Sequence, residues 1–122
     1  MDNSEDIKNN AKKVWSGFAP LENLTGTAAP RLIKFANINK NQKILDVACG
    51  TGVVALTAAR SGANVFGSDL TPELLERAEE NNKLFKLSVK FTEADVEKLP
   101  YDDAFFDAVS YTHLTLPTKR IV

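Results

Sequence analysis

The sequence has very few of the residues that mark disulfide-rich or metal-binding proteins. It contains one cysteine and one histidine in 122 residues, which excludes an internal disulfide and a cysteine metal cluster. No apolar run approaches the roughly 20 residues that a membrane-spanning helix needs. The N-terminus also lacks the apolar segment of a signal peptide. These absences predict a soluble cytoplasmic protein without a metal site.

The sequence has no excess of charge of either sign. Fifteen lysines and arginines stand against 16 aspartates and glutamates, for a net charge of −1. Because the lysines are scattered among acids, no basic face for nucleic acid is predicted. The chain has no internal repeat or low-complexity segment. Its length suits one small domain but is short for a complete doubly wound one.

The most informative stretch is KILDVACGTG, residues 43–52. Its apolar residues Ile44, Leu45 and Val47 lack helical spacing, as expected of a buried parallel strand. The glycine-containing turn then leads into a helical pattern at 53–60. Glycines allow a tight turn and a close approach of the backbone to a ligand, and the unpaired N–H groups at the helix start face that ligand.

Two interpretations of this turn compete. Gly50-x-Gly52-x-x-Ala55 matches the dinucleotide fingerprint, which is a weak signal alone. Asp46 adds information because it places a carboxylate inside the apolar strand, where it is costly unless it is bonded. Loop N–H groups or a ligand amine could bond it. Alternatively, Asp46 is a strand-end residue that caps its own turn.

The rest of the chain alternates helices and strands. An N-terminal helix is predicted from apolar residues at helical spacing, and it ends near Gly17 and Pro20. A second helix is predicted at 27–38. We expect the first helix to pack on the domain through its apolar stripe, which consists of Ile7, Ala11, Val14, Trp15 and Phe18.

Two further strands follow, at 64–69 and 89–93, with a helix at 72–84 between them. Such βαβ units predict parallel strands joined by right-handed crossovers. The first of these strands ends in Asp69, where an acid can accept both hydroxyls of a ribose. An alternative role as a helix cap is predicted to be filled by Thr71, which leaves Asp69 free for a ligand. A fourth strand is predicted to begin at Phe105.

The string DVACGTG resembles motif I of the class I S-adenosylmethionine-dependent methyltransferases. The segments EADVEKLP and LPYDDAFFDAV resemble the type 11 methyltransferases related to ubiquinone and menaquinone biosynthesis, so that the resemblance covers roughly 41–108. It implies an α/β fold with N-terminal helices and a Rossmann-like doubly wound parallel sheet, partial here with strand order 3-2-1-4. It also implies that an N-terminal helix often covers the cofactor, with Trp15 and Phe18 near ligand or acceptor.

The resemblance assigns the cofactor S-adenosyl-L-methionine to the carboxyl ends of the first three strands. The residues it implies for the methionine part are Asp46, Ala48, Cys49, Gly50 and Gly52. Those for the ribose and the adenine edge are Asp69 and Leu70, and those for adenine are Asp95 and Val96.

The implied reaction is methyl transfer to a small-molecule acceptor, for which the protein mainly supplies proximity and alignment. No general base can be named. Two other functions remain open: an NAD(P)-binding oxidoreductase domain and a non-catalytic S-adenosylmethionine-binding module. Asp46 within the first strand and Asp95 after the third favour the methyltransferase.

We hypothesise that the last stretch, 109–122, is translated sequencing adapter and not native protein. The residues VSYTHLTLPT back-translate without a mismatch to a transposase-type sequencing adapter, although their alternation also permits a native strand. We therefore expect three parts: a helical segment at 1–40, a cofactor-binding core at 41–108 and a non-native tail at 109–122. His113 receives no catalytic role. The chain is then expected to be the front portion of a longer enzyme and to be inactive by itself.

Overall fold

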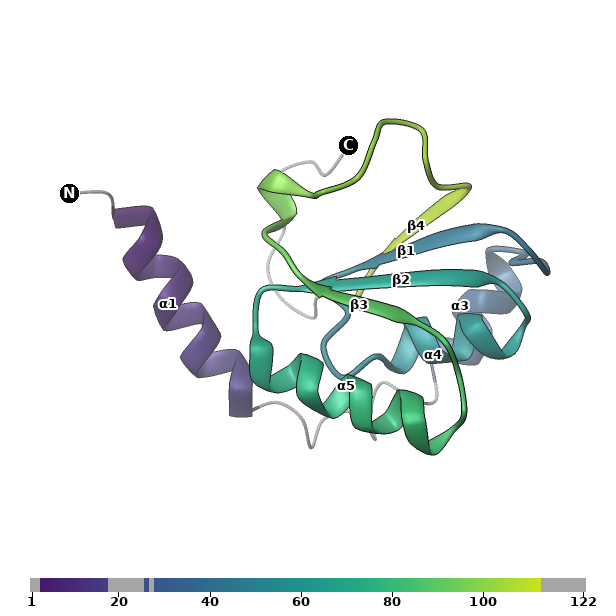
Figure 1. The fold of residues 1–122 in the computed structure, drawn as a ribbon, viewed down its shortest axis with the longest axis horizontal. Coiled ribbons are helices and arrows are strands. Elements are labelled where there is room, and N and C mark those ends of the chain that lie inside the picture. The colour runs from purple at the N-terminus through teal and green to yellow at the C-terminus, as the bar shows by residue number, and fades with distance from the viewer. Residues whose placement is uncertain (1–2, 18–25, 27, 113–122) are drawn as a thin grey trace.

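A four-stranded parallel sheet forms the centre of the molecule (Figure 1). The structure is a computed structural model that describes residues 3–17, 26 and 28–112, with the side chain of residue 15 left aside. The strands are β1 (Lys43–Val47), β2 (Asn64–Asp69), β3 (Lys90–Glu93) and β4 (Ala108–Tyr111). They lie in the order β3-β2-β1-β4, which confirms the predicted Rossmann-like topology.

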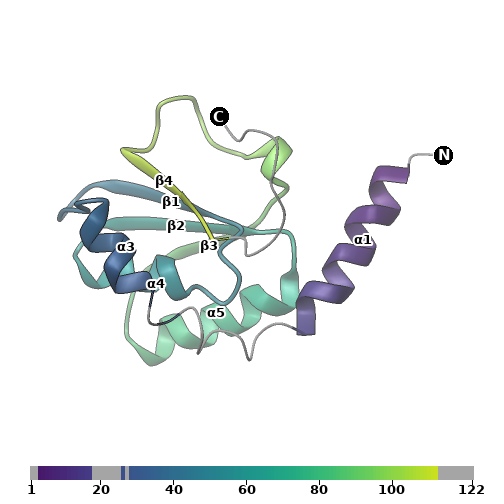
Figure 2. The same cartoon turned by 180° about the vertical axis from the view of Figure 1, so that it is seen from behind.

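Three helices cover one face of this sheet (Figures 1 and 2). They are α3 (Ala29–Phe35), α4 (Val53–Arg60) and α5 (Pro72–Leu84), and a short 3-10 helix, η2 (Val96–Lys98), follows β3. The N-terminal helix α1 (Asn3–Trp15) lies beside the end of the sheet where α5 begins. None of the helices in the described part of the chain is long and apolar enough to cross a bilayer.

The apolar core lies between the sheet and these three helices. Ile44 of β1 and Val65 of β2 are each 2% exposed and point toward the helices. Small residues on α4 let it approach the strands closely, since Ala55 and Ala58 are fully buried. The core thus fixes β1 and β2 rigidly, and with them the loops at their carboxyl ends.

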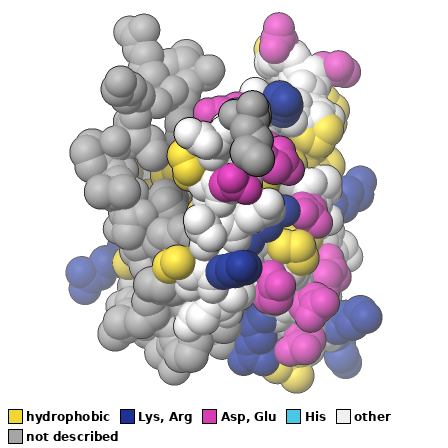
Figure 3. Space-filling view, turned by 90° about the vertical axis from the view of Figure 1, so that its left-hand side faces the viewer, with side chains coloured by type: hydrophobic (Ala, Val, Ile, Leu, Met, Phe, Trp, Pro, Cys, Tyr) yellow, Lys and Arg dark blue, Asp and Glu magenta, His cyan; other side chains and the backbone are white. Residues whose placement is uncertain are grey.

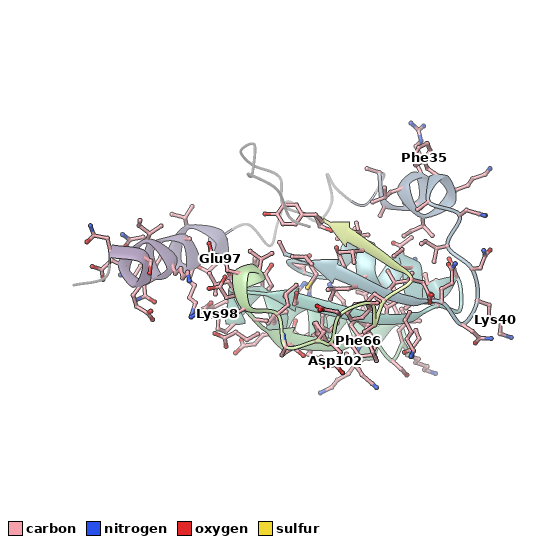
Figure 4. All side chains as sticks on the ribbon, turned by 90° about the horizontal axis from the view of Figure 1, so that it is seen from above. Phe35, Lys40, Phe66, Glu97, Lys98 and Asp102 are labelled. Carbon is pink, nitrogen blue, oxygen red and sulfur yellow. The ribbon has the colours of Figure 1, made fainter. Side chains whose placement is uncertain are left out.

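Aromatic residues of the connection between β3 and β4 pack against β2. The ring of Phe66 makes edge-to-face contacts with Tyr101, Phe105 and Phe106 at centroid distances of 6.0, 5.7 and 5.4 Å (Figure 4). The prediction that the fourth strand begins at Phe105 is therefore wrong, because both phenylalanines belong to this cluster. The strand begins three residues later, at Ala108.

Two other predicted boundaries shift by small amounts. Strand β3 begins at Lys90 and not at Val89, because both backbone groups of Val89 pair with the Asn82 side chain, at 3.0 and 3.2 Å. The second helix spans Ala29–Phe35, which is shorter than predicted, and the predicted start at residue 27 lies outside the described residues.

Helix α1 does not pack as its apolar stripe predicted. Ile7 is 66% exposed and Val14 is 61% exposed, so these two residues do not join the core. The side chain of Trp15 and residue Phe18 lie outside the described part of the chain. Helix α1 instead contacts the domain through lysines, whose partners are described below.

Candidate cofactor site

The carboxyl ends of β1 and β2 bring two of the predicted loops into direct contact. The loop after β1 contains Gly50, whose backbone N–H donates to Oδ2 of Asp69 at 2.9 Å. Cys49 donates its N–H to the carbonyl of Ser68 at 2.9 Å. The glycine loop and the acid at the end of β2 therefore form one hydrogen-bonded unit, at the end of a parallel sheet where ligands of such folds bind.

The two glycines of this loop serve different needs. Both have left-handed backbones, with φ of +57° at Gly50 and +88° at Gly52. A Cβ on Gly50 would meet open space, whereas one on Gly52 would lie 2.9 Å from the Phe91 ring. Gly50 thus leaves space on the side where a ligand can approach, and the lack of a side chain at Gly52 lets the loop pack against β3.

This difference predicts opposite consequences for two alanine variants. Gly52→Ala should lower the free energy of unfolding by about 2 kcal/mol or more, because it combines backbone strain with overpacking against Phe91. Gly50→Ala should cost about 1 kcal/mol from strain alone. Its larger effect should fall on ligand affinity, since its methyl group would enter the open side of the loop.

Urea unfolding of both variants, together with ligand titration, checks this prediction. Equal loss of stability in the two variants would contradict the assignment of Gly52 to packing and Gly50 to the ligand side.

Ala48 adopts a backbone conformation that is unusual for a residue with a side chain. Its φ is +54°, in the left-handed region, directly after β1. We expect Ala48→Gly to raise the free energy of unfolding by about 0.5 kcal/mol, as relief of strain exceeds the added entropy of the unfolded chain. Thermal unfolding checks the sign. A lower melting temperature would show that the Ala48 methyl group contributes packing that outweighs its strain.

Asp46 is completely buried beneath the glycine loop. Its Oδ1 accepts hydrogen bonds from the hydroxyls of Ser110 at 2.9 Å and Thr112 at 2.6 Å. Its Oδ2 is buried without a hydrogen-bond partner among the described residues. Burial raises the pKa of the Asp46 carboxyl from 3.8 to about 7, against the lowering effect of the two hydroxyls. Asp46 is therefore near its titration point at neutral pH.

Asp69 is more constrained than predicted. Besides the bond from Gly50, its Oδ1 accepts the backbone N–H of Thr71 at 2.8 Å. Thr71 is the N-cap residue of α5 and Pro72 begins the helix, as predicted, but the Thr71 side chain makes no capping bond. Each carboxylate oxygen has a second lone pair, so Asp69 can still accept from a ligand while it holds both loops.

Asp95 also has partners on both oxygens. It caps η2 by accepting the N–H of Glu97 on Oδ1 at 3.0 Å, and its Oδ2 forms an ion pair with Lys8 of α1. The hydrogen bond from Lys8 lowers the pKa of the Asp95 carboxyl. The neighbouring Val96, at the start of η2, is 36% exposed. Asp95 and Val96 thus follow the third strand, as the sequence predicted, and the Asp95 carboxylate is paired with Lys8.

Cys49 and Leu70 contribute less than their positions suggested. Cys49 is 2% exposed, and burial raises the pKa of its thiol well above the usual value. Its N–H is paired with the Ser68 carbonyl and its own carbonyl accepts the Gly52 N–H, each at 2.9 Å. Leu70 is half-buried after β2. Neither side chain is placed to do chemistry.

Sequence reasoning missed three residues that shape this site. They are Lys8, which pairs with Asp95; Phe91, which packs under Gly52; and Asn81, whose amide donates to the Thr51 carbonyl at 3.4 Å. A signal for Asn81 existed. It lies seven residues after Leu74 on the buried stripe of α5, where a polar side chain needs a partner.

Comparisons with known proteins give the family and the fold of the chain. A family model described as a methyltransferase domain matches residues 44–121. An uncharacterised protein of Mycobacterium bovis is 42% identical over 91 residues, which are 75% of this chain and 33% of that protein. A demethylmenaquinone methyltransferase of Chlorobaculum tepidum is 40% identical over 84 residues, which are 68% of this chain and 33% of the enzyme.

Solved structures share the fold. The PH0226 protein of Pyrococcus horikoshii superimposes with a TM-score of 0.63 at 30% identity, over 77% of this chain and 43% of that protein. The chain thus spans about a third of the length of its sequence relatives.

Proposed function

The chain belongs to the family of S-adenosylmethionine-dependent methyltransferases, and from this membership we propose that it is the cofactor-binding part of an enzyme that methylates a small-molecule acceptor. The observation that carries the proposal is the hydrogen bond between Gly50 N–H and the Asp69 carboxylate. It joins the glycine loop and the acid of β2 into one cradle. Asp69 can accept from ribose hydroxyls there, while Gly50 leaves room beside it.

Three features fit this cofactor. The open space where a Gly50 side chain would lie can admit the methionine part of S-adenosylmethionine. The carboxylate of Asp69 keeps lone pairs for two hydroxyls. Asp46 has a buried oxygen that no described residue hydrogen-bonds, and its negative charge, when ionised, favours a nearby ammonium group. A contact to that oxygen requires the residues that cover it to move, because Asp46 is completely buried.

The chain's own residues bind and orient, and none is assigned to proton transfer. S-adenosylmethionine supplies a methyl group on a sulfonium, which is already a good leaving group for transfer to a nucleophile. The rigid β1 and β2 fix the cradle, so its main contribution is alignment. A buried free cysteine in a chain without a disulfide is compatible with our proposal of a cytoplasmic location.

Equilibrium titration tests the proposed cofactor. The chain should bind S-adenosylhomocysteine, which has the adenosine and amino acid parts of the cofactor, and should bind NAD at least tenfold more weakly. Binding of NAD with equal or higher affinity would favour the oxidoreductase alternative. Binding of S-adenosylhomocysteine by the whole protein without methyl transfer to any acceptor would favour a non-catalytic binding module.

We also propose that residues 109–122 are translated adapter and that the native core ends at residue 108. Ten successive residues, VSYTHLTLPT, that back-translate to the adapter without a mismatch support this. It affects the site, because Ser110 and Thr112 donate to Asp46 and would be replaced in the native protein. Re-sequencing the source DNA across codon 108 from an upstream primer tests it. Recovery of the same residues would make this segment native and its bonds to Asp46 part of the enzyme.

A further inference from the structure

Helix α1 reaches the candidate adenine end of the site through two lysines. Lys8 forms ion pairs with Asp95 and with Glu97, the latter at 3.6 Å, and Lys12 pairs with Glu93 at 3.3 Å. The two lysines are four residues apart and so lie on the same face of the helix. Figure 4 shows Glu97 on η2, on the side of the domain that faces α1. Helix α1 is thus held to the β3–η2 segment by charge.

This contact lies within an acidic surface. Figure 3 shows acidic side chains gathered on the side of the molecule where α1 and α5 lie, with lysines or arginines among them. On the β3–η2 segment the three acids are Glu93, Asp95 and Glu97, and α1 supplies two lysines that form ion pairs with them. The Lys8–Asp95 pair is half-buried, with 28% and 19% of the two side chains exposed.

Lys8 forms an ion pair with the Asp95 carboxylate, which the proposed function assigns to the binding of adenine. An adenine amino group is a neutral donor to the Asp95 carboxylate, whereas the Lys8 ammonium adds the Coulomb attraction of an ion pair to its hydrogen bond. The other oxygen of Asp95 is already used by the Glu97 N–H. A ligand donor at the outer oxygen of Asp95 would lie beside the positively charged ammonium of Lys8, whose hydrogens repel it, so the two donors compete for this oxygen.

We propose that Lys8 is an internal competitor for the adenine end of the site, so that cofactor binding displaces it from Asp95 and loosens α1 from the β3–η2 segment. This inference rests on the proposed function and adds a regulation of the same site. Displacement couples occupancy of the cofactor site to the position of α1. The coupling depends on salt, because exposed ion pairs weaken as ionic strength rises.

Titration of S-adenosylhomocysteine into the 122-residue chain and two variants tests the proposal. Lys8→Met keeps most of the side-chain volume and removes the charge, and Lys13→Met is the matched control on another face of α1. Lys8→Met should bind roughly threefold more tightly than the unmodified chain at low salt, as expected for loss of a single partly exposed ion pair. The difference should shrink in about 0.5 M salt, and Lys13→Met should match the unmodified chain.

A second readout follows α1 directly. Hydrogen exchange of amides 3–15 should accelerate when S-adenosylhomocysteine is added to the unmodified chain, and should already be fast in Lys8→Met. Unchanged or weaker binding of S-adenosylhomocysteine by Lys8→Met would contradict the proposal. Lys8 would then bind Asp95 together with the ligand, and not in its place. If neither the unmodified chain nor Lys13→Met binds the ligand, the proposed function fails and the competition fails with it.

Discussion

Replacing Asp69 with alanine should weaken S-adenosylhomocysteine binding by roughly a hundredfold. The estimate follows from the loss of two hydrogen bonds between a carboxylate and ribose hydroxyls, each of which contributes about 1.5 kcal/mol or more. The same side chain holds Gly50 N–H and Thr71 N–H, so the variant also loses the bonds that join the two loops. Affinity and stability should therefore fall together in Asp69→Ala.

A milder variant separates the two effects. Asp69→Asn keeps the shape and one acceptor oxygen, so it can keep one of the two backbone bonds that Asp69→Ala loses, while its NH2 group faces the other N–H donor. It should still lose roughly tenfold in affinity, because a neutral amide is a weaker acceptor. Asp102→Ala is the control, as Asp102 is an exposed acid in the β3–β4 connection. Both affinities are measured by titration at a temperature where urea unfolding shows each variant to be folded. Unchanged affinity in folded Asp69→Asn would show that Asp69 does not bind the ribose hydroxyls.

Asp46→Asn should make the protein more stable at pH 8 and weaken its cofactor binding. The pKa of the Asp46 carboxyl is about 7 in the folded protein and 3.8 in the unfolded reference. The folded state therefore binds more protons between pH 4 and 7, and stability falls as pH rises through that window. Above pH 7 the ionised buried carboxylate costs up to about 4 kcal/mol, which asparagine avoids.

Urea unfolding at pH 5 and pH 8 measures this effect. The unmodified chain should lose stability between the two values, and the variant should show a flatter profile. Its affinity for S-adenosylhomocysteine should fall, because the negative charge near the proposed ammonium position is gone. A variant that is less stable than the unmodified chain at pH 8 would show that the hydrogen bonds of Asp46 outweigh its burial.

Local patterns in the sequence predicted the central fold well. The apolar run of β1, the glycine turn and the helix after it follow from residues that are neighbours in sequence. The strand order of the described sheet, which the family resemblance implied, is confirmed. Asp46 and Asp69 were found because an acid within an apolar strand, or at its end, is conspicuous, and both are buried.

Contacts between distant residues were not predictable in the same way. Lys8 and Asp95 are 87 residues apart, and neither belongs to a pattern that names the other. The aromatic cluster on Phe66 was missed because Phe105 and Phe106 also suit a strand, and only the packed sheet decides between the two. The dual role of Asp69 was missed because backbone donors leave no mark in a sequence.

The central claim is that the glycine loop, the end of β2 and the start of η2 together hold the adenosyl cofactor. Amide chemical shifts of the isotopically labelled chain, recorded while S-adenosylhomocysteine is added, test it most directly. The account predicts the largest changes at residues 48–52, 69–71 and 95–96. Shifts confined to the far side of α5, or no shifts at saturating ligand, would contradict it.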